Sequence, residues 1–208
     1  MRSARTANLG PRKSPRQQRS QATVEAVLEA TIRVLLARGY QGTTTTAVAE
    51  RAGVSIGSLY QYFPNKDSLM AALVKRHTAD AIRCIDEVLQ TSSQCDLKDS
   101  MRTIVRAGIA AHRLHPALHK ILVEQVPRIG QVKAAMNTSA IVTRKLAKWL
   151  DERERFEVLE CERTAFFIET IVEALTHRII VDREQDICEA DLEDEGTRLL
   201  TAYLTRQT

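Results

Sequence analysis

The sequence has no apolar stretch close to the roughly 18 residues that cross a bilayer. Its first residues are basic and polar, without the apolar segment of a secretion signal. We therefore expect a cytoplasmic protein with no membrane partner. A C-x-x-C pair is also missing, because Cys84, Cys95, Cys161 and Cys188 are scattered along the chain. This spacing favours reduced thiols within helices over a disulfide framework.

Motifs typical of enzymes are missing too. There is no glycine-rich phosphate loop, no nucleophile elbow and no H-E-x-x-H sequence, so an α-helical enzyme remains only as an alternative and we expect no cofactor. Alternating strand patterns, β-hairpin dipeptides and internal repeats are absent. Apolar residues instead recur at helical spacing, as at Val24, Val27, Leu28 and Leu35. The sequence therefore predicts an all-α protein.

The predicted helices cover most of the chain after a basic N-terminal arm. They run over residues 20–38, 45–52, 56–63, 66–90, 97–114, 117–126, 130–151, 156–183 and 189–205. Residues 1–18 have no apolar periodicity and contain Gly10, Pro11 and Pro15, which predicts a disordered arm.

Charge is divided unevenly along the 208 residues. Residues 1–76 hold twelve Lys or Arg against four acidic residues, a net charge of +8. Since the whole chain is +4, the remainder is −4. This distribution indicates a protein that approaches phosphate groups with its N-terminal part only.

The stretch from Gly39 to Leu73 predicts a helix-turn-helix followed by the start of a third helix. Hydroxyls at Thr43 to Thr46 can cap the first short helix. Gly53 tolerates the left-handed backbone that a tight helix exit requires. Ser55 can cap the second helix and Asn65 the third.

The same stretch resembles the DNA-binding domain of the TetR/AcrR family of transcriptional regulators. The resemblance is carried by Gly39-Tyr40, Thr44-Thr45, Val48-Ala49, Ala52-Gly53-Val54-Ser55, Leu59-Tyr60, Tyr62-Phe63, Lys66 and Leu69. It covers roughly residues 20–75, and elsewhere it is one of length, helical organisation and two weaker stretches, 114–128 and 171–177. It implies a helix-turn-helix DNA-binding domain at 19–65, a connecting helix at 66–90, and an effector-binding and dimerisation domain at 91–208.

By position, the resemblance also implies which residues contact double-stranded DNA at a (pseudo)palindromic operator. Thr45 and Thr46 would touch the backbone or nearby bases, Ile56, Gly57, Ser58 and Gln61 would face bases, and Tyr60, Tyr62 and Lys66 would hold phosphates. The chemistry is compatible, because Gln61 can pair with adenine and Ile56 can pack on a thymine methyl group. The helix has no arginine for a guanine contact, and Thr46 stands where several relatives carry a longer polar side chain. The operator sequence therefore stays open.

The helix around residues 165–181 is apolar on more than one side and needs burial on two sides. Together with the helix at 189–205 it predicts a two-fold homodimer interface, which the family resemblance also implies. The interface residues we expect are Phe166, Ile171, Leu175, Leu200 and Tyr203. The alternative is that both helices fill the core of a monomer.

An effector cavity is expected among the C-terminal helices, although each apolar candidate can equally be plain core. The candidate lining residues are Met101, Ile104, Val105, Ile109, Leu122, Glu124, Met136, Trp149, Phe167, Glu169 and Glu173. Glu169, Glu173 and His177 recur every four residues and share one helix face. They can form a solvated seam, reach the dimer interface or bind a ligand. Glu124 and Gln125 leave the same alternatives open.

His112, His115 and His119 suggest a metal site by their spacing, but Pro116 interrupts the run. A helix restarts at or near such a proline, so the three histidines need not share a face. No cysteine or close carboxylate cluster completes a ligand set, so we expect no metal site.

These features together predict a homodimeric, ligand-responsive DNA-binding regulator that acts as a repressor released by a small-molecule effector. A transcriptional activator and a regulator that responds to a protein remain alternatives. The sequence does not identify the effector or the regulated genes.

Overall fold

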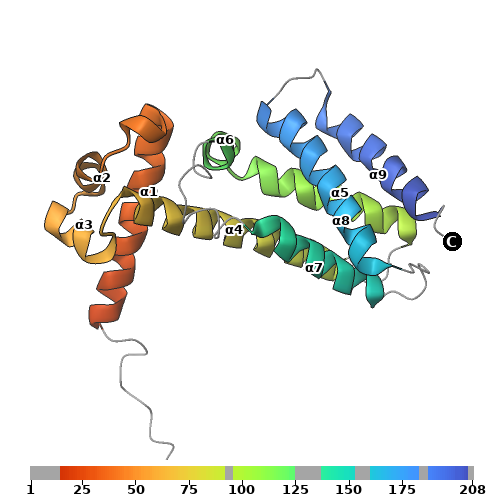
Figure 1. Ribbon diagram of the computed structural model, residues 1–208, viewed down its shortest axis with the longest axis horizontal. Helices are drawn as coiled ribbons and strands as arrows, with labels where there is room; N and C mark the ends of the chain where they lie inside the picture. The colour runs from red at the N-terminus through yellow and green to blue at the C-terminus, as the bar shows by residue number, and fades with distance from the viewer. Residues whose placement is uncertain (1–14, 92–95, 125–136, 153–159, 183–186, 206–208) are drawn as a thin grey trace, which may run out of the picture. The chain divides into compact units, whose positions relative to one another are not determined.

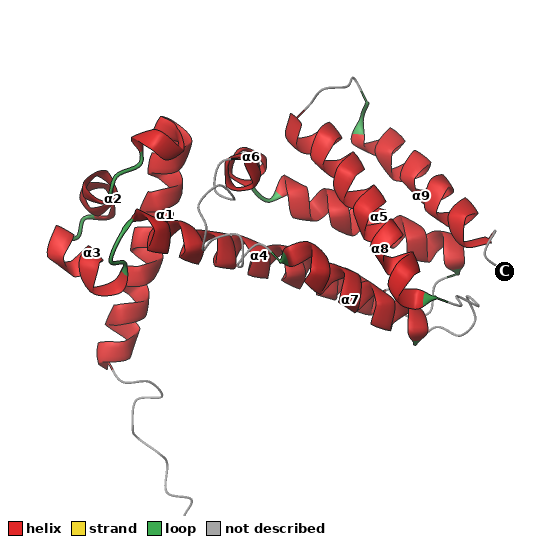
Figure 2. Cartoon of the chain, viewed as in Figure 1, coloured by secondary structure: helices red, strands yellow, loops and turns green. Residues whose placement is uncertain are grey.

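The computed structural model describes residues 15–91, 96–124, 137–152, 160–182 and 187–205. Every regular element in these ranges is helical, which confirms the all-α prediction (Figures 1 and 2). The elements are α1 (Pro15–Gly42), α2 (Thr45–Ala52), α3 (Ile56–Tyr62), α4 (Lys66–Thr91), α5 (Leu97–Arg113), α6 (Pro116–Glu124), α7 (Thr138–Asp151), α8 (Cys161–Thr176), a π-helix (His177–Asp182) and α9 (Glu189–Thr205). In the described part of the chain, no helix is both long and apolar enough to cross a membrane.

Most predicted helix bounds agree with the structure to within two residues. Helix α1 begins at Pro15, so the last four residues of the predicted arm 1–18 are helical. Proline is favoured at the first helical position, because its fixed φ suits the helix and its missing N–H is not needed there. Residues 1–14 lie outside the described residues, as do 125–126, 130–136, 156–159 and 183 of three predicted helices.

The chain divides into two compact units, Met1–Leu69 and Met70–Thr208, and the boundary falls within α4. In the first unit α1 packs against α2, and α2 packs against α3. Val27, Leu35, Val48 and Leu59 are completely buried and supply its core. Helical geometry in α1 breaks at Gly39, whose φ of 65° is accessible to glycine at little cost.

The second unit is a helical bundle in which α7 packs along α8, and α5 packs along α9. Its core is apolar and includes Met101, Ile168 and Leu200, each completely buried. Polar contacts tie α4 to α7. Lys145 Nζ donates to Asp86 Oδ1 at 2.7 Å, and the indole of Trp149 donates to the Leu89 carbonyl at 3.2 Å.

Helices α5 and α8 approach each other closely at Gly108. A Cβ atom built on Gly108 would lie 2.3 Å from Val172 Cγ1 and 3.3 Å from Thr176 Cγ2. A larger residue at this position would require the Val172 side chain or α8 to shift. This approach places the next turn of α5, which carries His112, beside the polar residues of α8.

Candidate DNA-binding surface and effector cavity

The helix-turn-helix is fixed by the caps that the sequence predicted. Thr44 Oγ1 accepts from the Ala47 N–H at 3.1 Å at the start of α2. Ser55 Oγ accepts from the Ser58 N–H at 3.1 Å at the start of α3. Between them Gly53 ends α2 in the left-handed region, with φ 67° and ψ 29°. These local interactions set how α3 leaves the turn.

Helix α3 presents most of its candidate base-contacting residues to solvent. Leu59 is completely buried and anchors the helix to the core of the first unit. On the other side Ile56 is 41% exposed and Tyr60 48% exposed, and Gly57 and Gln61 are exposed as well. A surface with an apolar, an aromatic and an amide side chain on a short capped helix can contact base edges in a major groove.

The remaining hydroxyl candidates are partly engaged within the unit. Ser58 is half-buried and its hydroxyl bonds with that of Ser55 at 2.8 Å. The hydroxyl of Tyr60 bonds with that of Thr45 at 3.1 Å, which joins α2 to α3. Thr46 is exposed. Tyr60 is therefore held in one orientation while half of its surface stays open.

Lys66 has partners inside the first unit. Its ammonium donates to the Tyr40 carbonyl and lies 3.8 Å from the centroid of the Tyr40 ring. Burial lowers the pKa of Lys66, although the nearby Asp67 carboxylate opposes this shift. Tyr62 is half-buried. In this arrangement Lys66 links the start of α4 to the C-terminal end of α1, rather than extending freely toward a phosphate.

The second unit encloses a cavity of about 200 Å³ among α4, α5, α6, α7 and α8. Most of its wall is apolar. The hydroxyls of Thr78 on α4 and Thr138 on α7 bond to each other at 3.0 Å and form part of the wall. Glu169 also lines the cavity; burial raises the pKa of its carboxyl, and a hydrogen bond with Ser139 opposes this rise. The cavity therefore suits a largely apolar molecule with a few polar groups.

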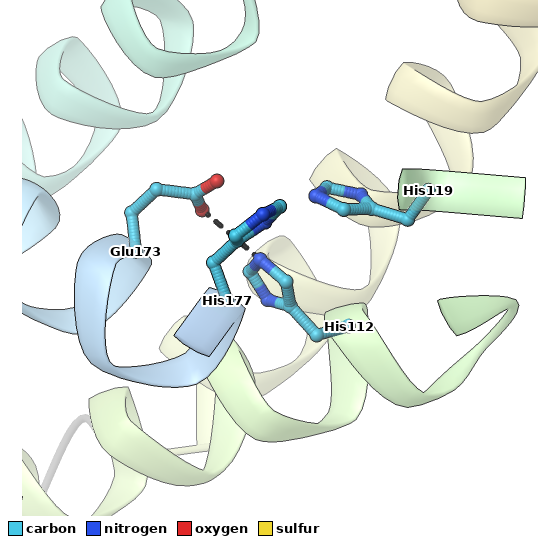
Figure 3. A group of neighbouring side chains, drawn as sticks. All are labelled: His112, His119, Glu173 and His177. Carbon is cyan, nitrogen blue, oxygen red and sulfur yellow. Dashed lines mark ion pairs between the residues drawn. The ribbon is translucent and has the colours of Figure 1, made fainter. Parts of the chain in front are cut away.

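A cluster of imidazole and carboxylate groups lies beside the cavity, and three of its four side chains line it (Figure 3). His112 comes from α5, His119 from α6 and Glu173 from α8, and His177 follows one turn later at the start of the π-helix. One ligand atom from each of the four side chains lies within 4.8 Å of the others. His77 on α4 adjoins the cluster, with its Nε2 3.0 Å from His119 Nδ1.

The charges in this cluster depend on one another. Burial lowers the pKa of His112, but the Glu173 carboxylate, 3.3 Å from Nε2, and the Gly108 carbonyl outweigh burial, so the pKa is raised overall. Burial raises the pKa of Glu173, but the His112 contact outweighs it and the net shift is downward. Burial and the neighbouring His112 and His77 lower the pKa of His119 to about 3. His119 is therefore neutral near pH 7.

The expected effector residues are divided between the cavity wall and other places. Ile104, Leu122, Glu169 and Glu173 line the cavity. Met101, Val105, Ile109 and Trp149 instead belong to the packed core and have no surface on this cavity. Glu124 is exposed, with a carboxylate oxygen 3.8 Å from Lys120 Nζ, and Met136 lies outside the described residues, as does Gln125.

The sequence prediction missed the small and polar residues of the wall. Ala81, Ala107, Gly108 and Ala111 line the cavity, as do the histidines His77, His112 and His119. Large apolar side chains fill the space between helices, whereas small ones leave it open. A signal was present in the spacing of Ala107, Gly108, Ala111 and His112, which places three small residues and one polar residue on a single helix face.

The expected interface residues also differ in their exposure. Phe166 is exposed on α8, and Ile171, Leu175 and Tyr203 are half-buried. Leu200 instead is completely buried in the core of its own subunit. Phe167, which we expected in the cavity, is exposed, and its ring packs against those of Phe166 and Tyr203 with centroid separations of 5.7 and 6.0 Å. Leu199 on α9 is 49% exposed.

Comparison with known proteins matches both units. Residues 27–73 match the family model described as bacterial regulatory proteins, tetR family, and residues 96–204 match the tetracyclin repressor-like C-terminal domain. An uncharacterised HTH-type transcriptional regulator of Bacillus subtilis, YvkB, is 36% identical over 58 residues, which are 28% of this chain and 31% of YvkB. The chain thus matches about a third of the length of that relative.

Solved structures share the fold over nearly the whole chain. The crystal structure of a Mesorhizobium loti protein assigned to the TetR family has a TM-score of 0.77 and 17% identity, and the similarity covers 90% of this chain and 98% of that one. Bacillus subtilis FadR in complex with stearoyl-CoA has a TM-score of 0.66 and 18% identity, with 86% and 97% covered. With both domain models matched, one of them over more than half of the sequence, the chain belongs to the TetR family of bacterial regulatory proteins.

Proposed function

We propose that the chain is a homodimeric, sequence-specific DNA-binding regulator, a repressor that a small-molecule effector releases from its operator. The observation that carries the proposal is the outer side of α3. Ile56, Tyr60 and Gln61 stand exposed on a helix whose start is capped by Ser55 and whose inner side is anchored by Leu59.

In this function α3 enters the major groove. Gln61 accepts from and donates to an adenine edge, and Ile56 packs on a thymine methyl group, each discriminating between bases by at most about 1–3 kcal/mol. Gly57 lets the start of α3 come close to the DNA. Thr45, Thr46 and Tyr60 contact the phosphate backbone, which orients the unit without reading sequence. The excess of basic residues in 1–76 supports the approach to DNA.

A second copy of the chain is the occupant we propose for the exposed apolar surface of α8 and α9. Phe166, Phe167 and Leu199 are large apolar side chains that are exposed in the single chain. Tyr203 packs on Phe167 and adds to this surface. A two-fold pair would bury this surface and present two copies of α3 to half-sites about 34–36 Å apart, one turn of the duplex.

The effector binds in the cavity of the second unit. Its wall includes Val74, His77, Thr78 and Ala81 of α4, and the first residues of the same helix belong to the first unit. A ligand that favours one arrangement of the wall therefore acts on a helix shared with the DNA-binding unit. It shifts the equilibrium only by its difference in affinity between the DNA-bound and released states.

Footprinting of the purified chain on its own upstream DNA tests the proposal. We expect protection of a (pseudo)palindromic site, and loss of sequence preference but not of all binding in Gln61→Ala. Transcription from that promoter with and without the chain then distinguishes repression from activation. The proposed function would be contradicted if no duplex in a panel of random sequences were protected, and if Gln61→Ala had the same DNA affinity and sequence preference as the wild type.

A further inference from the structure

Residues from four helical elements converge beside the cavity on a single point. His112 and His119 approach it from α5 and α6, and Glu173 and His177 from α8 and the following π-helix (Figure 3). The four candidate ligand atoms lie within 4.8 Å of one another, and three of the four side chains line the cavity. π-Helical turns are rare and frequently lie at functional sites, and here one begins at His177.

Two imidazole nitrogens at this point are buried and make no hydrogen bond to the described residues. They are Nε2 of His112 and Nε2 of His119. A buried polar atom without a partner costs about 1–3 kcal/mol. A pair between His112 and Glu173 accounts for the first of them, since Glu173 Oε2 lies 3.3 Å away, but it leaves Nε2 of His119 without a hydrogen bond.

The other nitrogen of each ring is already held. His112 Nδ1 lies 2.8 Å from the Gly108 carbonyl, which can only accept, so Nδ1 carries the hydrogen and Nε2 is the atom directed toward the cluster. His119 Nδ1 bonds with His77 Nε2 at 3.0 Å. Histidines that bind metals are fixed in the same way, with one nitrogen on the metal and the other bonded to a carbonyl or side chain.

The donor set selects a class of ion. Imidazole nitrogens with one carboxylate suit Zn²⁺ and neighbouring divalent transition metals, whereas Mg²⁺ and Ca²⁺ prefer oxygen donors. Tetrahedral Zn²⁺ with bonds of about 2.0–2.1 Å places its ligand atoms about 3.3 Å apart. The His112–Glu173 separation of 3.3 Å already matches this edge, and the remaining separations, up to 4.8 Å, would shorten on binding. The Glu173 side chain is 49% exposed, which gives an ion access.

We propose that His112, His119, Glu173 and His177 form a binding site for a divalent transition-metal ion of the Zn²⁺ class, and that this ion is an effector of the chain. The site joins α5, α6 and α8 through one ion, so binding favours the arrangement in which these helices are closest. The regulatory part rests on the proposed DNA-binding function, whereas metal binding itself does not.

Calorimetric titration of Zn²⁺ into the full chain, stripped of metal and free of a histidine tag, tests the site. We expect one ion per chain, and a loss of affinity of at least tenfold in His119→Gln and in Glu173→Gln. His115→Gln is the matched control, because His115 is exposed and outside the cluster. Circular dichroism confirms that each variant keeps its helices, and Co²⁺ in place of Zn²⁺ should give the visible absorption of a tetrahedral ion.

The two parts of the inference can fail separately. Absence of saturable Zn²⁺ binding, an equal loss in His115→Gln, or a Co²⁺ spectrum of an octahedral hydrated ion overturns the site. On the footprinted operator, Zn²⁺ should change the affinity of the wild-type chain at least fivefold and that of His119→Gln not at all. Zn²⁺ binding with unchanged operator affinity overturns the effector role alone. A chain that binds no DNA overturns the proposed function, and the titration still decides the site.

Discussion

The ammonium of Lys66 contacts both the carbonyl and the ring of Tyr40, and so connects the first turn of α4 to the C-terminal end of α1. A lysine that holds a phosphate needs its ammonium free to reach outward. The geometry here favours a role for Lys66 inside the first unit, with its positive charge acting on DNA only at long range. Stability and salt dependence separate these two roles.

For Lys66→Met, we predict a loss of about 1 kcal/mol in the free energy of unfolding, because the cation–π contact and the hydrogen bond are both lost. The slope of DNA affinity against salt should stay close to that of the wild type. A lost phosphate contact would instead reduce the slope by about one. Urea titration and binding at several salt concentrations measure the two quantities. Lys75→Met, which removes an exposed charge from the same helix, is the control.

Glu169 illustrates the cost of placing a carboxylate in an apolar wall. Burial raises its pKa, so the folded state binds the proton more tightly than the unfolded state does. The stability linked to this proton is present below the unfolded pKa of about 4.3 and is lost as pH rises through the folded pKa. The ionised carboxylate therefore costs stability near neutral pH, and its place in the cavity wall suits contact with a polar group of the proposed effector.

Glu169→Gln should therefore raise the free energy of unfolding at pH 8, and the gain should shrink as the pH is lowered toward 4.5. Glutamine keeps the size of the side chain and can still bond to Ser139. Glu87→Gln, an exposed change on α4, should show no comparable trend. Urea titrations at a series of pH values measure the effect, and a gain that grows on acidification would show that the carboxylate is stabilised rather than penalised by its surroundings.

Among the helices, α5 both packs closely against α8 and lines the cavity. Gly108 allows α8 to approach, and Ala107 and Ala111 leave the space that becomes the cavity. In the interior of a helix, glycine is less favourable than alanine by about 1 kcal/mol in free energy. Its presence here is explained by the position of Val172, which a Cβ atom would meet at 2.3 Å.

Gly108→Ala should for this reason destabilise the chain by about 1–3 kcal/mol through overpacking, despite the better helix propensity of alanine. The displaced α8 should also weaken Zn²⁺ binding, because Glu173 and His177 move with it. Gly57→Ala is the comparison, since a Cβ there meets only Ser55 Oγ at 3.9 Å and should cost no stability. Thermal unfolding and Zn²⁺ titration measure both effects. Equal stability of the two variants would mean that α8 adjusts freely.

Much of this arrangement could be predicted from the sequence, because local signals determine it. Threonine, serine and asparagine caps and the left-handed Gly53 fixed the helices of the first unit. The cavity and the histidine cluster depend on packing between helices distant in sequence. Pro116 does separate His112 from His119 along the chain, as expected, but α5 and α6 turn the two rings toward each other, with centroids 4.7 Å apart. No spacing rule along one helix predicts such a contact.

At the scale of the whole molecule, the central question is which apolar side chains are covered by a second copy. Two neighbouring residues of α9 differ in this respect. Leu199 is 49% exposed and can be covered by a second copy, whereas Leu200 is completely buried within its own subunit. A charge at Leu200 would therefore disrupt the fold of the subunit itself. A charge at Leu199 would stay in water in the single chain and become unpaired and buried only in the dimer.

Leu199→Arg should dissociate the dimer at micromolar concentration while the helical content stays unchanged, whereas Leu200→Arg should unfold the second unit. Leu114→Arg, at an exposed leucine outside the proposed interface, should leave the dimer intact. Sedimentation at several concentrations with circular dichroism separates these outcomes. The Leu199→Arg monomer should retain only weak, salt-sensitive DNA binding, because one α3 no longer raises the effective concentration of the other at the second half-site. If a monomeric wild-type chain binds a palindromic operator tightly, the α8 and α9 surface has another partner, and the two half-sites are not read together.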